Sequence, residues 1–370
     1  MAESIAAEQP VAERTALGLV RSPAHPHSLL GRLALGIVVL LCLLMVTVVV
    51  SAAQGPARVS YASTASILLH RVGLATGDFT ASEQRIVEQI RLPRIATALL
   101  VGLALGVAGS VLQGIFRNPL ADPGIIGVSG GGALGAVAAI ASGAAALHLL
   151  ALPASALAGA LVAAFTVYSV AATRGRSTAA SLILAGIAVT ALTGALTAGI
   201  ISFTEDRERN RDMLFWLMGG LDNRTWEHAR LIAPAVLAGA AVCVAFGREL
   251  NLMLLGEESA RSLGVSVGTA RATLLVVAAV ITGVAVAVSG MIHFVGLIVP
   301  HVVRLVVGYD HRLVVPLSGL AGAAFLVAAD AIARSAIQPG ELRVGIVTSA
   351  LGAPFFLFLI YRGRRERLPV

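Results

Sequence analysis

Long apolar runs separated by short polar turns make up most of this chain. In order, the runs cover residues 33–50, 95–116, 125–150, 154–172, 177–203, 231–246, 272–289, 291–307, 313–332 and 344–361. A hydrocarbon core about 30 Å thick needs about 20 apolar residues per helix, and most of the runs approach that length. The pattern predicts an all-α integral membrane protein with about ten transmembrane helices.

Three polar segments interrupt the apolar runs. Residues 51–89 have room for an extramembrane helix, which we expect near 61–71. Residues 204–230 are highly charged, and the apolar stretch 213–221 within them is too short to span, so it predicts a surface or dipping helix. Residues 248–271 are polar and helix-forming, so this loop must lie outside the bilayer.

The two ends of the chain differ from its middle. Residues 1–31 are polar and interrupted by three prolines, so we expect a disordered tail without a cleaved signal. Residues 362–370 form a short basic tail. Between them we expect one transmembrane domain over residues 32–361, with 248–271 as its main extramembrane loop.

Particular residues predict where helices begin and pack. Pro93, in the sequence Arg-Leu-Pro-Arg before the second run, predicts a helix start. Gly102, Gly106 and Ser110 are spaced by four, which lets a neighbouring helix approach closely, although an alanine-rich composition explains any single pair equally well. The five glycines of residues 127–135 fit no common phosphate-loop spacing, so they indicate helix breakage and close packing.

Composition and charge narrow the possible functions. The chain is 57% hydrophobic and 13% charged, with a net charge of +7. All 27 basic residues are arginine, and they cluster at the ends of apolar runs, as orienting charges do, rather than forming a nucleic-acid surface. Without lysine the chain has no Walker-type phosphate loop. Cys42 and Cys243 fall inside apolar runs and predict neither a disulfide nor a metal site.

The distribution of arginine predicts an orientation. Ten crossings put both termini on one side, together with Arg174, Arg176, Arg312 and the 248–271 loop, and the positive-inside rule makes that side cytoplasmic. The outward side then carries Arg91, Arg94, Arg334 and the arginines of 207–211. Because these break the rule, they suggest a docking surface for an acidic partner. Asp330 and Arg334 lie four apart and are expected to pair on one helical face.

Six motifs, taken in order, resemble a known family. They are RLPR at 91–94, QGIFRNPLADPGIIGVSGG at 113–131, GEESARSLGV at 256–265, FVGLIVPH at 294–301, DHR at 310–312 and VGIVTSALGAPFF at 344–356. Together they resemble the membrane permeases of ABC importers for iron chelates, haem and cobalamin, the type II importers. The resemblance covers about residues 33–361.

The resemblance implies an assembly and a location. Permeases of this family have ten helices per subunit and form homodimers around a central translocation pathway in the bacterial inner membrane, with both termini cytoplasmic. Two separate ATPase subunits bind ATP and Mg, and a periplasmic substrate-binding protein docks on the outer face. The chain itself is then a transport subunit with no catalytic residues, no bound cofactor and no resident metal.

The resemblance also implies roles for particular residues. Segment 248–271 resembles the cytoplasmic loop that couples to the ATPase, through Gly256, Glu257, Glu258, Ala260, Arg261, Leu263 and Gly264. The positions expected to dock the binding protein are Arg91, Arg94 and Arg334. The cytoplasmic gate of the pathway is expected at Asn118, Leu120, Ser177 and Thr178.

The resemblance leaves three candidate substrates. The sequence 113–137 favours haem, with ferric siderophores and cobalamin as alternatives. His293, at a position where the family usually has a small residue, is a possible substrate contact, although a lone histidine at a helix end is more often packed or hydrogen-bonded. An ion-coupled secondary transporter is the alternative of another class, but it needs buried carboxylates, which the runs almost lack.

Overall fold

A computed structural model describes residues 29–55, 57, 59–71, 73–74, 77–171, 179–337 and 340–365, and within these residues the chain is helical without strands. The main helices are α1 (Leu29–Ala53), α2 (Tyr61–Arg71), α3 (Ala81–Arg85), α4 (Leu92–Phe116), α5 (Val128–Ala141), α6 (Ala151–Ala171), α7 (Ala179–Phe203), α8 (Arg207–Leu217), α9 (Trp226–Ala245), α10 (Gly247–Leu254), α11 (Glu257–Ser262), α12 (Val267–Ser289), α13 (Val295–Val307), α14 (His311–Ser335) and α15 (Val344–Arg365). The expected tails 1–31 and 362–370 fall largely outside the described residues, as do Ser177 and Thr178.

The described helices confirm an integral membrane fold. Seven are long and apolar enough to span a bilayer, and three shorter apolar helices lie in α5, α13 and α15. These ten elements match the ten predicted runs one for one. Because three of them are shorter than a full span, the number of crossings stays a prediction.

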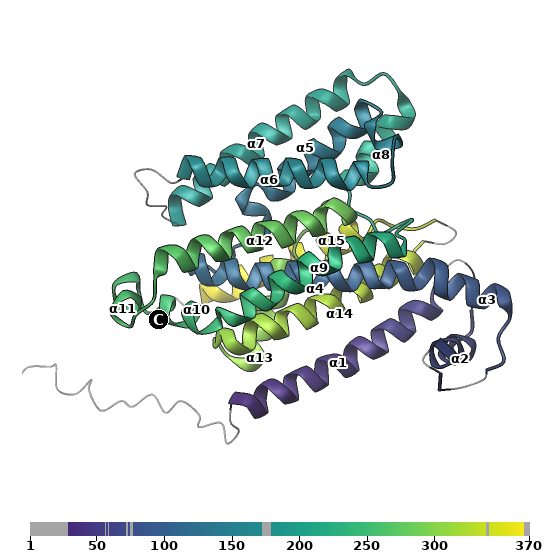
Figure 1. The fold of residues 1–370 in the computed structure, drawn as a ribbon, viewed down its shortest axis with the longest axis horizontal. Coiled ribbons are helices and arrows are strands. Elements are labelled where there is room, and N and C mark those ends of the chain that lie inside the picture. The colour runs from purple at the N-terminus through teal and green to yellow at the C-terminus, as the bar shows by residue number, and fades with distance from the viewer. Residues whose placement is uncertain are drawn as a thin grey trace, which may run out of the picture.

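Helix α4 lies at the centre of the molecule, where it packs against α14, α12, α9 and α13. Figure 1 shows α5, α6, α7 and α8 grouped on one side of this core and α1 at the opposite edge. α1 contacts α14 but leaves Leu35, Val38 and Met45 exposed. An apolar helix with an uncovered apolar face is suited to contact with lipid.

Close packing of α4 on α14 depends on glycine, as its spacing predicted. A methyl group added at Gly102 would meet the carbonyl oxygen of Gly322 at 2.3 Å, and one at Gly106 would meet that of Ser318 at 2.1 Å. Carbon cannot approach oxygen so closely, so both positions need glycine if the helix axes are to stay where they are.

The glycines of residues 127–135 behave as predicted. Gly127 has a φ of 78° and separates a short 3-10 turn (Pro123–Ile126) from α5. Gly131 and Gly135 lie against α6, where added methyl groups would meet the carbonyl oxygens of Gly159 and Ser155 at 2.3 and 2.2 Å. Glycine therefore breaks the helix at one end of this segment and permits close packing along the rest.

Pro93 stands in the first turn of α4, as predicted, and a π-helical turn joins α4 to the helix before it. α3, a π-helical turn (Ile86–Arg91) and α4 form one 36-residue apolar helix, Ala81–Phe116. Proline has no N–H to donate, and the wider π turn directly before it absorbs the missing hydrogen bond. Two predicted boundaries were wrong, because α5 ends at Ala141, well before 150, and α13 begins only at Val295, after Phe294 in a left-handed conformation.

The polar segments also fold into helices. α2 covers residues 61–71 as predicted. The apolar stretch 213–221 lies in α8 only as far as Leu217, and α8 buries Met213 and Trp216 in a small cluster with α5. The 248–271 loop holds two short helices, α10 and α11, and α11 ends before Gly264, whose φ is 87°.

Candidate functional site

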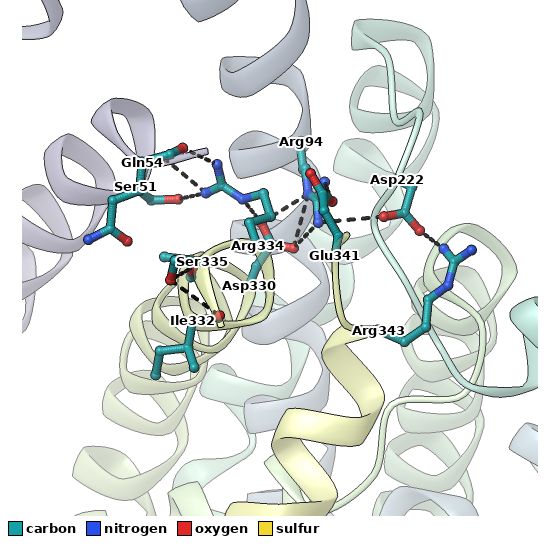
Figure 2. Close-up of polar contacts among 11 residues, drawn as sticks. Ser51, Gln54, Arg94, Asp222, Asp330, Ile332, Arg334, Ser335, Glu341 and Arg343 are labelled. Atoms are coloured by element: carbon teal, nitrogen blue, oxygen red, sulfur yellow. Dashed lines mark hydrogen bonds and ion pairs between the residues drawn. The ribbon is translucent and has the colours of Figure 1, made fainter. Parts of the chain in front are cut away.

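Charged side chains from distant parts of the chain meet where α1 and α14 end, which we call the network end. The group, called the arginine network below, consists of Arg91, Arg94, Asp222, Asp330, Arg334, Glu341 and Arg343. Figure 2 shows most of its contacts. It joins α4, the turn before α9, the end of α14 and the start of α15.

Asp330 is the centre of the arginine network. Its side chain is fully buried and accepts hydrogen bonds from Nη2 of Arg94 at 2.8 Å and from Nε of Arg334 at 3.1 Å. This confirms the predicted Asp330–Arg334 pair. Arg94 also donates to Glu341 at 2.7 Å, so three helical segments share one set of charges.

Arg91 and Arg334 bind the end of α1. Arg334 donates to the carbonyl oxygens of Gln54 at 2.6 Å and Ser51 at 2.9 Å, and Arg91 donates to that of Ala52 at 2.6 Å. The last carbonyls of a helix lack partners within it and carry partial negative charge, so cations stabilise them. The two guanidinium groups therefore fix α1 to the core.

The three arginines predicted to dock a partner protein are buried in this structure. Arg91, Arg94 and Arg334 are 4%, 9% and 3% exposed. The structure brings them together on one end, as the sequence predicted, but their donors are used inside the chain. Sequence reasoning missed this role. A signal existed, because α1 has no basic residue in its last turn to neutralise its last carbonyls.

The exposed Arg211 and the half-buried Arg343 lie beside the buried arginines. Arg343 pairs with Asp222, and both Arg343 and Arg211 stack on the ring of Phe215, at 4.4 and 4.9 Å from its centroid. A cavity of about 540 Å³ adjoins them, lined also by Arg209. This surface is accessible at the network end, whereas the guanidinium groups of Arg91, Arg94 and Arg334 are not.

The opposite end of the molecule carries the predicted coupling segment. Glu257 of α11 pairs with Arg271 of α12 and with Arg261 at 3.4 Å. The hydrogen bond from Arg271 lowers the pKa of Glu257 most, and Arg117 adds a smaller effect. Ala260 is fully buried, so α11 is attached to the core on one face.

Two exposed leucines flank α11 in the coupling segment. Leu255 and Leu263, on either side of α11, are 64% and 57% exposed, and Glu258 is exposed between them. Gly256 has a φ of 113°, which allows the sharp turn into α11. Exposed leucines on a polar extramembrane loop indicate a surface that another protein covers.

Helix α10 is connected to the membrane core through Asn251. Its amide donates to Asp310 at 2.6 Å, and its carbonyl oxygen accepts from the backbone N–H of His311 at 2.8 Å. Burial alone would raise the pKa of Asp310, but hydrogen bonds from Arg312 and Asn251 outweigh it and lower the pKa to about 2. These hydrogen bonds tie the loop to the start of α14.

A larger cavity lies between α5 and α7. It measures about 750 Å³, has mostly apolar walls and is lined by Asp122, Thr190, Met291 and His293 among others. His293 is exposed within it, so the side chain is not packed in the core. The predicted substrate contact therefore faces a space large enough for part of a ligand.

Two predicted gate residues lie in the turn after α4. Asn118 accepts a hydrogen bond from the backbone N–H of Leu120 at 2.9 Å, and Leu120 is 41% exposed. Arg117, before them, has a φ of 48° and turns the chain out of α4. The turn lies at the coupling end, where a cytoplasmic gate is expected.

Comparisons with known proteins agree with this arrangement. Residues 43–362 match the model of the FecCD transport family. The cobalamin import system permease protein BtuC of Halobacterium salinarum is 49% identical over 284 residues, which is 77% of this chain and 75% of that protein. The hemin transport system permease protein HmuU of Yersinia pestis is 39% identical over 280 residues, 75% of this chain and 84% of that protein.

A solved structure has the same fold. It is an inward-facing conformation of a transporter assigned to the metal-chelate ABC type, and it superposes with a TM-score of 0.78 at 32% identity. The match covers 88% of this chain and 98% of the other. The fold, the order of the helices and the relatives therefore point to one kind of protein.

Proposed function

Because the chain belongs to the FecCD transport family, whose members are permease subunits of ABC importers, we propose that it imports a metal-centred macrocycle of the haem or cobalamin type. The chain provides the pathway, and ATP hydrolysis takes place on a separate subunit. In this proposal two copies of the chain enclose the pathway in a bacterial inner membrane, with both termini and the coupling end in the cytoplasm.

The coupling segment carries the proposal. It combines an exposed apolar surface, Leu255 and Leu263, with ion pairs and hydrogen bonds that connect it to α12 and α14. A loop that only linked two helices would need neither. In our proposal an ATPase subunit covers this surface and ATP-driven closure moves α11, and with it the transmembrane helices.

A substitution at the coupling surface tests this role. Leu263→Asp puts a charge on the exposed face of α11 without disturbing buried residues, so we expect assembly with the ATPase or its coupling to uptake to fall at least about tenfold. Leu74→Asp is the matched control, since Leu74 is 75% exposed and lies away from α11. The measurements are co-purification of the ATPase and substrate-stimulated ATP hydrolysis. Unchanged coupling in Leu263→Asp would rule out this surface.

At the network end we propose docking of a substrate-binding protein. The exposed Arg211, which stacks on Phe215 beside Arg343, would meet its acidic side chains first. Arg91, Arg94 and Arg334 would take part indirectly, by holding α1, α4 and α14 together, or directly if an incoming carboxylate replaced Glu341 on Arg94. Glu341 is the more exposed of the carboxylates that hydrogen-bond to Arg94, which makes it the exchangeable one.

We propose haem and cobalamin as alternative substrates. The sequence favoured haem, whereas the 49% identical relative is a cobalamin permease, so the cobalamin alternative has equal support. Both ligands are large macrocycles that expose acidic or amide groups. A wide cavity with apolar walls and few polar residues fits such a ligand better than it fits a bare ion.

A further inference from the structure

A small cationic pocket lies at the coupling end, apart from the proposed pathway cavity. Its volume is about 230 Å³, and its walls come from the end of α4, the turn after α4, α13 and the start of α14. The polar residues that line it are Gln113, Arg117, Asn118, His301, Arg304, Tyr309 and His311. Among the described residues that line the pocket, none is acidic.

The pocket has more positive charge than its surroundings neutralise. Arg304 is 8% exposed and donates to the side-chain oxygen of Gln113, which is neutral. Within the described part of the chain no carboxylate forms an ion pair with Arg304 or Arg117. Glu257, whose pKa Arg117 influences, already pairs with Arg271. A buried guanidinium without a counter-ion is costly, so the pocket is suited to an anion.

The pocket also contains an unused acceptor. Both the backbone N–H and Nδ1 of His311 face the side-chain oxygen of Asn251, at 2.8 and 3.0 Å. That oxygen only accepts, because the amide of Asn251 is directed to Asp310, so Nδ1 carries the proton and Nε2 is left as an acceptor. His311 is 2% exposed, and its Nε2 has no partner in the described structure.

The pocket opens at the depth of lipid headgroups. α4 and α13 end beside it and α14 begins there, so it lies where the spanning helices leave the bilayer. Leu305 and Tyr309 line its mouth and are 69% and 73% exposed, and the neighbouring Val306 is 80% exposed. Exposed aliphatic side chains with a tyrosine beside them are typical of a surface between acyl chains and headgroups.

We propose that this pocket binds the headgroup of an anionic phospholipid that carries a hydroxyl group, of which phosphatidylglycerol is the simplest. Its phosphate accepts hydrogen bonds from Arg304 and Arg117, and its hydroxyl donates to Nε2 of His311. Basic pockets between transmembrane helices are suited to anionic headgroups in general. The lipid also contacts Asn118 and Leu254, so it braces the turn after α4 against the end of α10.

Native mass spectrometry of the purified chain in mixed micelles tests this proposal. With phosphatidylglycerol and phosphatidylcholine at equal concentration, the wild-type chain should retain phosphatidylglycerol preferentially. R117Q and R304Q should each lower that retention about tenfold, which is about 1.4 kcal/mol, because each variant loses hydrogen bonds to a charged phosphate. R248Q removes an exposed arginine at the same end but outside the pocket, and should retain the lipid. Arg117 is exposed, so R117Q decides the question even if R304Q does not fold.

Two further ligands test the role of the hydroxyl group and the source of the phosphate. Dioleoyl phosphatidylmethanol has the same singly charged phosphodiester but no headgroup hydroxyl, and it should be retained less well than phosphatidylglycerol. Equal retention of the two would overturn the role of His311. Inorganic phosphate at millimolar concentration should not displace the lipid, and displacement would identify a free-phosphate site instead. Equal loss of phosphatidylglycerol in R117Q and R248Q would show that only net charge matters and would overturn the proposal.

Discussion

At the scale of single residues, Asp330 has the largest structural consequence. It is fully buried, and its carboxylate is shared by Arg94 and Arg334, which in turn hold α1 and Glu341. A buried pair contributes little net stability compared with apolar residues, but removing one partner leaves the others buried and unneutralised. The network end therefore depends on this one negative charge.

Asp330→Asn tests that dependence. The change keeps the size of the side chain but leaves Arg94 and Arg334 without their shared carboxylate, so we expect a loss of about 3–5 kcal/mol in stability. Glu341→Gln is the control, because Glu341 is more exposed and the same loss of charge should cost about 1 kcal/mol or less. Thermal unfolding in detergent measures both. Equal shifts for the two variants would contradict the central role of Asp330.

His293 is the residue through which the substrate proposal can be tested. Because it faces the cavity between α5 and α7, His293→Ala should lower substrate uptake several-fold while leaving thermal stability unchanged. His148→Ala is the control, since His148 is exposed on a loop outside the cavity. Uptake at the wild-type rate in His293→Ala would remove this residue from the substrate path.

The sequence predicted which residues gather at one end of the molecule more reliably than it predicted their burial and contacts. The pairing of Asp330 with Arg334 followed from helical spacing alone. The burial of Arg91 and Arg94 did not, because it depends on how the ends of α1 and α14 pack against α4, a tertiary relation that no local pattern carries. The exposure of His293 likewise depends on α7, which is distant in the sequence.

At the scale of helices, glycine determines how closely α4 and α14 pack. Gly106→Ala would bring a methyl group to 2.1 Å from the carbonyl oxygen of Ser318, so the helices must separate. We expect a loss of about 1–3 kcal/mol, the usual cost of overpacking. Gly199→Ala on α7 is the control, because nothing lies within 4 Å of the added methyl and alanine favours a helix.

Thermal unfolding of the two glycine variants gives the comparison. We predict a lower unfolding temperature for Gly106→Ala and an unchanged or higher unfolding temperature for Gly199→Ala. A similar drop in the unfolding temperature of both variants would mean that another segment packs against α7 at Gly199 in the assembled protein. An unchanged temperature for Gly106→Ala would mean that α4 and α14 can separate without loss.

Helix boundaries were predictable only where a local signal ends the helix. α2 was predicted at its observed bounds because Ser60 precedes it and Gly73 follows it closely. Helices α5 and α13 are much shorter than their apolar runs, because the chain leaves the helix at Ser142 and enters it only after Phe294, within apolar sequence. Hydropathy cannot distinguish an apolar helix from an apolar turn that neighbouring helices bury.

At the scale of the whole molecule, two groups of polar residues lie at opposite ends of an apolar bundle. The arginine network gathers residues that the sequence assigned to the outer side, and α10, α11 and the 310–312 turn gather those assigned to the cytoplasmic side. Figure 1 shows α10 and α11 at one end and α2 and α3 at the other. Which end faces the cytoplasm follows from the arginine distribution and stays a prediction.

Uptake into lipid vesicles is the most direct measurement of whether this chain is an ATP-driven permease. The chain is reconstituted in lipid vesicles with the ATPase encoded beside it, and a binding protein loaded in turn with haem, cobalamin or a ferric siderophore is added outside. We predict ATP-dependent accumulation and stimulated ATP hydrolysis with haem or cobalamin, and little of either with the siderophore. Preferential uptake of the siderophore would contradict the proposed substrate class. Accumulation that needs no ATP and follows an ion gradient would contradict the account of this chain as an ATP-driven permease.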